Sequence, residues 1–157
     1  MKKQGFTLIE LMVVIVIMGI LAAVAVPKLF GQIAKSKASE VATNASTFKT
    51  ALDSYAMTEN KVGNATEIGY DVPNSGKTSG INFAYSVTVN GTKSIWEAEA
   101  KVGLNDCESG DKWDLAGEYT STTGKVAYTI SGTGVTKAAC KSLTPGFEKL
   151  GDAATGS

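Results

Sequence analysis

The sequence has 157 residues, a formal net charge of zero and 43% hydrophobic residues, which suffices for one domain together with a membrane anchor. It contains no histidine, and every basic residue is a lysine, so the commonest general base and metal ligand and the bidentate recognition of phosphate or guanine by arginine are all missing. We therefore expect no enzymatic activity, no cofactor or metal site, and no specific nucleic-acid partner.

The N-terminal segment combines a short basic stretch with a long apolar run. Lys2 and Lys3 precede Gly5, and the run from Phe6 to Val26 carries a single charge, on Glu10. As a helix rising ~1.5 Å per residue, this run spans the ~30 Å hydrocarbon core of a bilayer. An acidic side chain inside such a span is costly and usually has a function. The sequence thus predicts a transmembrane helix in which Glu10 needs a partner.

The residues Gly5-Phe6-Thr7-Leu8-Ile9-Glu10, followed by an apolar helix, resemble the N-terminus of the type IV pilin and pseudopilin superfamily. The resemblance implies that a prepilin peptidase cuts between Gly5 and Phe6 and methylates the new amino group of Phe6. It also implies that Glu10 pairs with the amino terminus of a neighbouring subunit. The specific resemblance covers about residues 1–60, and the remainder follows the family in architecture only.

A physical argument for Glu10 stands beside this resemblance. Cleavage after Gly5 would create a positive α-amine four residues before the carboxylate. Anchors packed side by side can place the amine of one chain against Glu10 of another, whereas a wrong register leaves a buried charge unpaired. We expect Glu10 to set the register of self-assembly.

Two other fates of this segment are a secretory signal peptide cut after Ala23-Val24-Ala25 and a plain signal anchor. The very short basic stretch, the long apolar run and the glutamate all favour pilin-type processing over a signal peptide. N-terminal sequencing separates the three fates, because the mature chain would begin at Phe6, Val26 or Met1 respectively.

The helix is expected to continue beyond the anchor. Gly19 and Pro27 weaken it, and by resemblance the segment between them loses helical structure in a filament; the alternative is a kink at Pro27. For a single subunit we expect a continuous or kinked helix from about Phe6 to Met57. Its second half is amphipathic, because apolar residues recur at spacings of three and four: Phe30, Ala34, Ala38, Val41, Ala45, Phe48, Leu52 and Tyr55.

After a polar loop over residues 59–80, the apolar period changes to two. Alternating runs at 83–89 and 95–102 flank Asn90-Gly91 and predict a hairpin with a type I′ turn. A further strand is expected at 125–131, paired with 118–121. The inward sets are Phe83, Tyr85, Val87 and Val89; Trp96, Ala98, Ala100 and Val102; and Val126, Tyr128 and Ile130. We predict an α+β fold in which a sheet of three or four antiparallel strands covers the amphipathic half of the helix.

Cys107 and Cys140 are predicted to form one disulfide, since an export anchor implies an oxidising compartment. The alternative is two free buried thiols. The position near the C-terminus resembles the disulfide-bounded region of type IV pilins, which is often exposed on the filament and used for adhesion. Oxygen-bearing side chains crowd this segment and could bind calcium, as in some pseudopilins, although a solvated acidic turn is the favoured interpretation: Asn105, Asp106, Glu108, Asp111 and Asp114.

The predicted organisation is a leader at 1–5, a transmembrane or filament-core helix half at 6–26 and a periplasmic or extracellular pilin domain at 27–157. The predicted function is that of a type IV pilus subunit that forms a helical homo-oligomer for adhesion, motility or DNA uptake. The alternative is a pseudopilin of a type II secretion system. The expected partners are the membrane, a prepilin peptidase, and an inner-membrane assembly platform with its ATPase. The chain would reside in the bacterial inner membrane before assembly and in an extracellular pilus afterwards.

Overall fold

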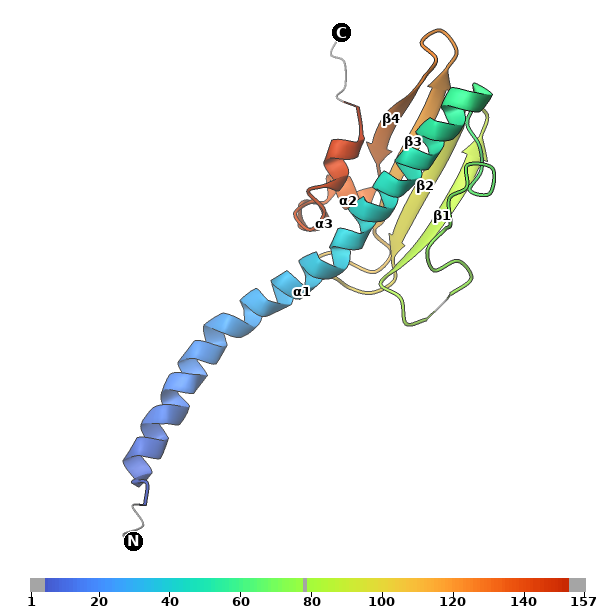
Figure 1. Ribbon diagram of the computed structural model, residues 1–157. Coiled ribbons are helices and arrows are strands. Elements are labelled where there is room, and N and C mark those ends of the chain that lie inside the picture. Colours follow the sequence, from blue (N-terminus) through green and yellow to red (C-terminus); the bar gives the residue numbers. More distant parts are fainter. Residues whose placement is uncertain (1–4, 78, 153–157) are drawn as a thin grey trace. The chain divides into compact units, whose positions relative to one another are not determined.

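The computed structural model describes residues 5–77 and 79–152 (Figure 1). Most of the expected leader, residues 1–4, and the polar C-terminal end, residues 153–157, lie outside the described residues. The chain divides into two compact units, 1–33 and 34–157, which are taken separately below. One helix, α1 (Leu8–Glu59), contributes residues to both units.

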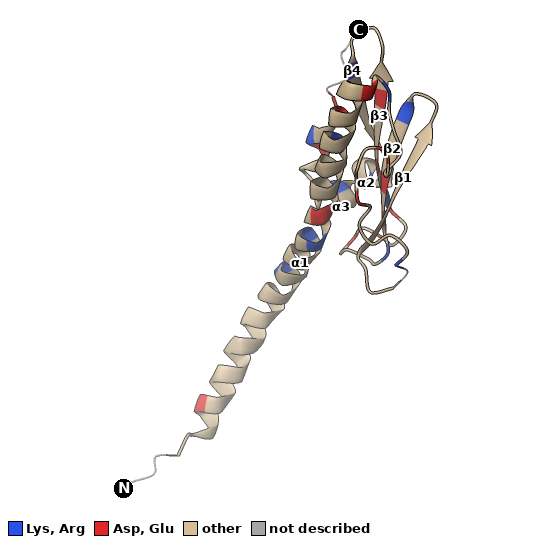
Figure 2. Cartoon of the chain, turned by 45° about the vertical axis from the view of Figure 1, so that its right-hand side comes forward, with Lys and Arg blue, Asp and Glu red and all other residues tan. Residues whose placement is uncertain are grey.

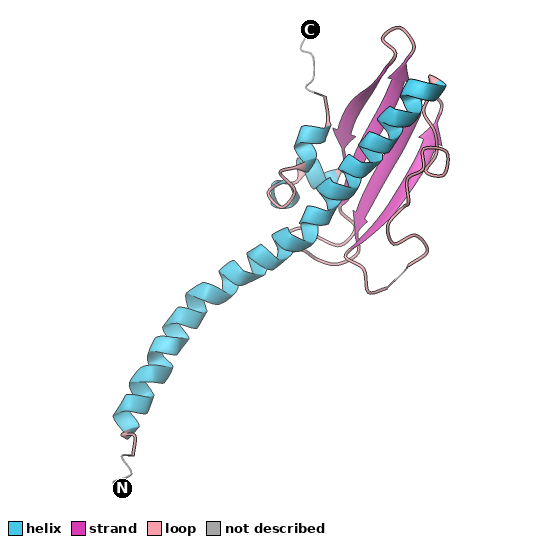
Figure 3. Cartoon of the chain, in the orientation of Figure 1, coloured by secondary structure: helices cyan, strands magenta, loops and turns pink. Residues whose placement is uncertain are grey.

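The second unit is an α+β domain in which the C-terminal part of α1 crosses one face of a four-stranded sheet (Figures 1 and 3). The strands are antiparallel neighbours in sequence order: β1 (Phe83–Asn90), β2 (Lys93–Ala100), β3 (Lys112–Thr120) and β4 (Lys125–Ser131). Three short elements follow: α2 (Thr133–Thr136), α3 (Ala138–Lys141) and the 3₁₀ helix η1 (Phe147–Leu150). The predicted fold class is confirmed, with four strands.

The domain core is built from the predicted stripe of α1 and the inward face of the sheet. Six residues of the predicted stripe are buried: Ala34, Ala38, Val41, Ala45, Phe48 and Leu52. The prediction was wrong at its two ends, because Phe30 is 61% exposed and Tyr55 is half-buried, while Ala56 is buried beside it. Both tryptophans are fully buried, and each indole N–H has an acceptor: Trp96 donates to the Tyr70 hydroxyl at 2.9 Å, and Trp113 donates to Thr144 Oγ1 at 2.9 Å. These two bonds satisfy the buried donors and tie the 60–80 loop and the C-terminal segment to the sheet.

Several predicted boundaries were wrong in detail. The helix begins at Leu8, not Phe6, because Thr7 caps its N-terminus as described below, and it ends at Glu59, not Met57. The strand predicted at 118–121 is much longer: β3 begins at Lys112, where Trp113, Leu115 and Gly117 face inward. The inward set includes Gly117, which has no side chain, so only Trp113 and Leu115 show the alternation in the sequence.

The β1–β2 hairpin also differs from its prediction. Asn90 pairs with Lys93, so Gly91 and Thr92 are the central residues of the turn. Gly91 has φ of 61°, and Thr92 is not among the positive-φ residues, so the turn is a type II′ turn with glycine first rather than type I′. The prediction of inward-facing residues was wrong at two strand ends. Val89 is exposed, and Val102 lies beyond the end of β2 and is half-buried.

Gly134 in α2 offers a sharp test of packing. An added Cβ there would overlap the indole of the fully buried Trp113. We expect Gly134→Ala to lower the free energy of unfolding by about 1–3 kcal/mol, the usual cost of overpacking, as measured by denaturant titration of the domain. Gly103→Ala is the matched control, since no atom lies within 4 Å of its added Cβ. Equal stabilities for the two variants would contradict the described packing around Trp113.

Candidate functional site

Glu10 lies in the first turn of α1, where it forms a capping box with Thr7. The Thr7 backbone N–H and hydroxyl donate to Glu10 Oε2 at 2.9 and 2.7 Å, and the Glu10 N–H donates to Thr7 Oγ1 at 3.3 Å. Such reciprocal bonds satisfy backbone donors that a helix N-terminus otherwise leaves unpaired. The predicted interpretation of Glu10 overlooked this local role, although the spacing Thr7-x-x-Glu10 in the sequence is the signal for it.

The apolar part of α1 is exposed on every side. Its large apolar side chains from Leu8 to Ile33 are between 44% and 79% exposed, and Phe6 just before it is 86% exposed. Charged residues are sparse along this half of the helix and gather along its C-terminal half and on the sheet (Figure 2). Among the described residues, α1 is the helix long and apolar enough to cross a membrane. A helix that is apolar all round needs lipid or other apolar helices around it.

Gly19 and Pro27 both lie inside α1, which is assigned as helical without interruption from Leu8 to Glu59. Proline lacks the N–H that would bond to the carbonyl of Ala23, one turn earlier. The expectation of a continuous or kinked helix in a single subunit agrees with this description. A loss of helix between the two residues in a filament stays a prediction.

The predicted disulfide is confirmed: Cys107 and Cys140 are joined, and both residues are fully buried. Cys107 follows the β1–β2 hairpin, and Cys140 belongs to α3, so the bond ties the C-terminal helices to the segment before β3. Both cysteines of the sequence are used, and the alternative of free thiols is therefore wrong.

Asp111 is the buried charged residue beside the disulfide. Its Oδ2 lies 3.3 Å from Cys107 Sγ and 3.1 Å from Cys140 Sγ, and it accepts the Glu108 N–H at 2.8 Å. Since disulfide sulfurs carry no hydrogen, the two sulfur distances are contacts and not hydrogen bonds. Burial opposes the ionisation of Asp111, but hydrogen bonds from the Glu108 N–H and from Lys137 outweigh it and lower the pKa of Asp111.

Lys137 supplies the positive charge for this segment, a role that no local pattern in the sequence indicates. Its ammonium lies 2.7 Å from Glu108 Oε2 and 3.0 and 3.1 Å from the two oxygens of Asp111. The three-residue cluster Cys107, Asp111 and Cys140 has its ligand atoms within 4.8 Å of one another, but its sulfurs are bonded to each other and are not thiolates. A thiolate metal site therefore does not fit the oxidised chain.

The other oxygen-bearing residues considered for calcium do not converge on a common point with Asp111. Asn105 donates to Asp106, Glu108 faces Lys137, and Asp114 lies in β3 next to Ser131 of β4. Glu108 and Asp111 are the two carboxylates of this set that lie close together, and both already pair with the ammonium of Lys137. We interpret this segment as a charge-paired turn rather than a cation site.

This interpretation predicts that divalent cations do not stabilise the domain against thermal unfolding. The midpoint of thermal unfolding should be the same in excess calcium and in excess chelator, because Lys137 already pairs with Glu108 and Asp111. Circular dichroism of the oxidised protein on heating measures it. A midpoint that falls by several degrees on adding chelator would contradict the assignment.

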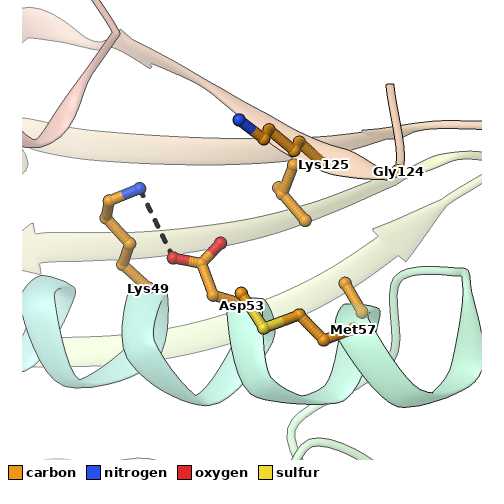
Figure 4. A pocket seen from close by; sticks show the side chains of 7 residues that line it. Lys49, Asp53, Met57, Gly124 and Lys125 are labelled. Atoms are coloured by element: carbon orange, nitrogen blue, oxygen red, sulfur yellow. Dashed lines mark ion pairs between the residues drawn. The ribbon is translucent and has the colours of Figure 1, made fainter. Parts of the chain in front are cut away.

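A hollow of about 240 Å³ lies between the end of α1 and the β3–β4 turn, lined by Lys49, Asp53, Ala56, Met57, Gly124, Lys125 and Val126 (Figure 4). Lys49 pairs with Asp53 at 3.6 Å, and its ammonium lies 3.3 Å from the centre of the Tyr128 ring. The Tyr128 hydroxyl donates to Asp53 at 2.7 Å. Burial and the nearby Asp53 carboxylate raise the pKa of Tyr128, so the hydroxyl stays protonated. These groups satisfy one another and brace α1 against β4.

The fold and the N-terminal geometry define a class of protein: an α+β domain preceded by an exposed apolar helix that is long enough to cross a membrane and has one carboxylate in its first turn. Residues 1–26 match the family described as the prokaryotic N-terminal methylation motif. The type IV major pilin protein PilA of Myxococcus xanthus is 44% identical over 70 residues, 44% of this chain and 32% of the relative. Fimbrial protein Q of Moraxella bovis is 40% identical over 95 residues, 57% of this chain and 60% of the relative.

A further relative is named for a secretion system and not for a pilus or fimbria. The type II secretion system core protein G of Vibrio cholerae is 43% identical over 70 residues, which cover 45% of this chain and 47% of that protein. The matches thus span 32% to 60% of the length of the three relatives. The methylation motif and the pilin relatives confirm the resemblance to the type IV pilin superfamily.

Proposed function

We propose that the chain is a structural subunit of a type IV pilus and polymerises through its N-terminal helix into a helical filament. The observation that carries the proposal is the apolar half of α1, which is exposed all round and holds one carboxylate in its first turn. Such a surface is stable in a bilayer and again in a bundle of copies of itself. The names of its pilin relatives support the same function.

Processing at Gly5 would prepare this helix for assembly. We infer that a prepilin peptidase cuts the Gly5–Phe6 bond and methylates Phe6, because the matched motif covers this segment. Gly5, Phe6 and Thr7 precede α1 and are not helical, so the bond lies outside the helix. N-terminal sequencing of the mature chain should start at N-methylated Phe6; a start at Met1 or Val26 would overturn this step.

Glu10 can serve both the single subunit and the filament. In the capping box both Thr7 donors reach Oε2, and within the described residues no hydrogen bond uses Oε1. Oε1 can accept a hydrogen bond from the amino group of a neighbouring Phe6 while the capping box stays intact. A matched register would pair every carboxylate and amine, whereas a shifted one would leave charges unpaired in a low dielectric.

The remaining parts of the proposal follow from assembly out of a membrane. The subunit would wait in the bacterial inner membrane and be extracted by an assembly platform with a separate ATPase, since nothing suggests catalysis by the chain itself. Gly19 to Pro27 would lose helical structure on packing in the filament. The domain from residue 27 onward would form the outer surface used for attachment, motility or DNA uptake.

A second function, that of a pseudopilin in a type II secretion system, is favoured by the relatives named core protein G. Electron microscopy of negatively stained cells with and without the gene distinguishes the two functions. Loss of long surface filaments on deletion supports the pilus. Intact filaments together with failed secretion of exported enzymes would overturn it in favour of the pseudopilin.

A further inference from the structure

The disulfide has a negative charge in direct contact with both of its sulfurs. Asp111 Oδ2 lies within 3.3 Å of each Sγ, and the side chain of Asp111 is only 6% exposed. The N–H of Glu108 and the ammonium of Lys137 hold the carboxylate in this place. Burial leaves little water to screen its charge from the sulfurs.

The surrounding charges do not cancel this field. Two carboxylates, Glu108 and Asp111, share one ammonium, Lys137, so the three groups carry a formal charge of −1. The Glu108 side chain is 78% exposed and that of Asp111 is 6% exposed, so Asp111 is the carboxylate that acts on the bond. The Lys137 ammonium contacts both Asp111 oxygens, Oδ1 at 3.1 Å and Oδ2 at 3.0 Å, and Oδ2 is also the atom that lies 3.3 and 3.1 Å from the two sulfurs. Negative charge is therefore the nearest charge to the sulfurs.

We propose that Asp111 protects the Cys107–Cys140 disulfide against exchange with external thiols. Because both cysteines are buried, exchange requires a local opening that admits a thiolate RS⁻ to one sulfur. The thiolate then attacks that sulfur, a new R–S–S–Cys bond forms, the Cys107–Cys140 bond breaks, and the other cysteine leaves as a thiolate that takes a proton from water. The incoming and leaving sulfurs both carry negative charge in the transition state. A fixed carboxylate beside both sulfurs raises that barrier and slows attack at either one.

Such protection would matter because this one disulfide ties the C-terminal segment to the chain before β3. It concerns the stability of the bond alone and does not depend on whether the chain builds a pilus or a pseudopilus. Asp111 acts here through charge on the sulfurs and is a protecting residue, not a catalytic one.

Two variants should change the rate of reduction in opposite directions. Asp111→Asn keeps the shape and the acceptor for Glu108 N–H but removes the charge, so reduction by 2-mercaptoethanol at pH 8 should be on the order of tenfold faster. Lys137→Met removes the compensating ammonium and should make reduction slower than in the wild-type protein. Rates are followed by alkylating free thiols and mass spectrometry of the folded oxidised chain.

A loosened structure would instead make both variants faster, and that result would overturn the proposal, as would an Asp111→Asn rate equal to the wild-type rate. In urea, where the domain is unfolded, all three proteins should be reduced alike.

A second measurement needs no variant. For the folded wild-type chain relative to the unfolded chain, cationic cysteamine should react faster than neutral 2-mercaptoethanol, and anionic 2-mercaptoethanesulfonate slower. Equal relative rates for the three thiols would equally overturn the proposal.

Discussion

Cells that make Glu10→Ala in place of the wild-type chain should insert it into the membrane normally but should assemble at least about tenfold less filament. The change removes the one acidic group of the apolar segment, so insertion becomes easier, while a neighbouring Phe6 amine loses its partner. Membrane fractionation measures insertion, and the amount of the chain in filaments sheared from cells measures assembly.

Thr7→Ala is the matched control for this result. It removes the hydroxyl that donates to Glu10 Oε2 and accepts the Glu10 N–H, but it leaves the carboxylate in place. If Glu10 acts by pairing between subunits, Thr7→Ala should assemble far more filament than Glu10→Ala. Equal losses would mean that the capping box and not the intersubunit pair is what assembly needs. Normal filaments from Glu10→Ala would refute the role of the carboxylate altogether.

Replacing both cysteines, as Cys107→Ser with Cys140→Ser, should lower the free energy of unfolding of the domain by about 3–4 kcal/mol. The disulfide closes a loop with a sequence separation of 33 residues, and the loop-entropy relation assigns this stabilisation to such a loop. The serine hydroxyls can donate to Asp111, which limits the additional cost of a buried polar group. Urea denaturation followed by tryptophan fluorescence measures the change, since Trp113 lies in the core beside this region.

The reduced wild-type chain is the control for the double variant. It should unfold at nearly the same urea concentration as the variant, because both lack the cross-link and keep the rest of the sequence. A loss of stability below about 1 kcal/mol in both proteins would show that the loop is already restrained by other contacts in the unfolded chain.

The sequence predicted the parts of the fold that rest on long periodic patterns. The stripe from Ala34 to Leu52 is buried as expected, and β4 has the predicted bounds, because apolar spacing directly reports which face is covered. The first half of β3 escaped prediction, since its apolar alternation is short: Trp113 and Leu115 face inward, but the next inward position is Gly117, which has no side chain. The turn type was missed by one residue, as register depends on strand pairing that a single strand does not reveal.

The candidate site was predictable only where its signal is local. Glu10 stands out because it is the lone charge in an apolar run, and its partner Thr7 lies three residues before it, at the spacing of a capping box. Lys137, in contrast, contacts Glu108 and Asp111, which lie 29 and 26 residues earlier in the sequence. These contacts depend on the disulfide and on the path of the chain through α2, which no pattern in the sequence specifies.

The central claim is that copies of this chain assemble into a filament through the processed N-terminal helix. Mass spectrometry of filaments sheared from the cell surface and purified tests it most directly. The account predicts that this polypeptide is a main component and begins at Phe6 with a methylated amino group. Filaments that lack the chain, or a filament-borne chain that still starts at Met1, would contradict the claim.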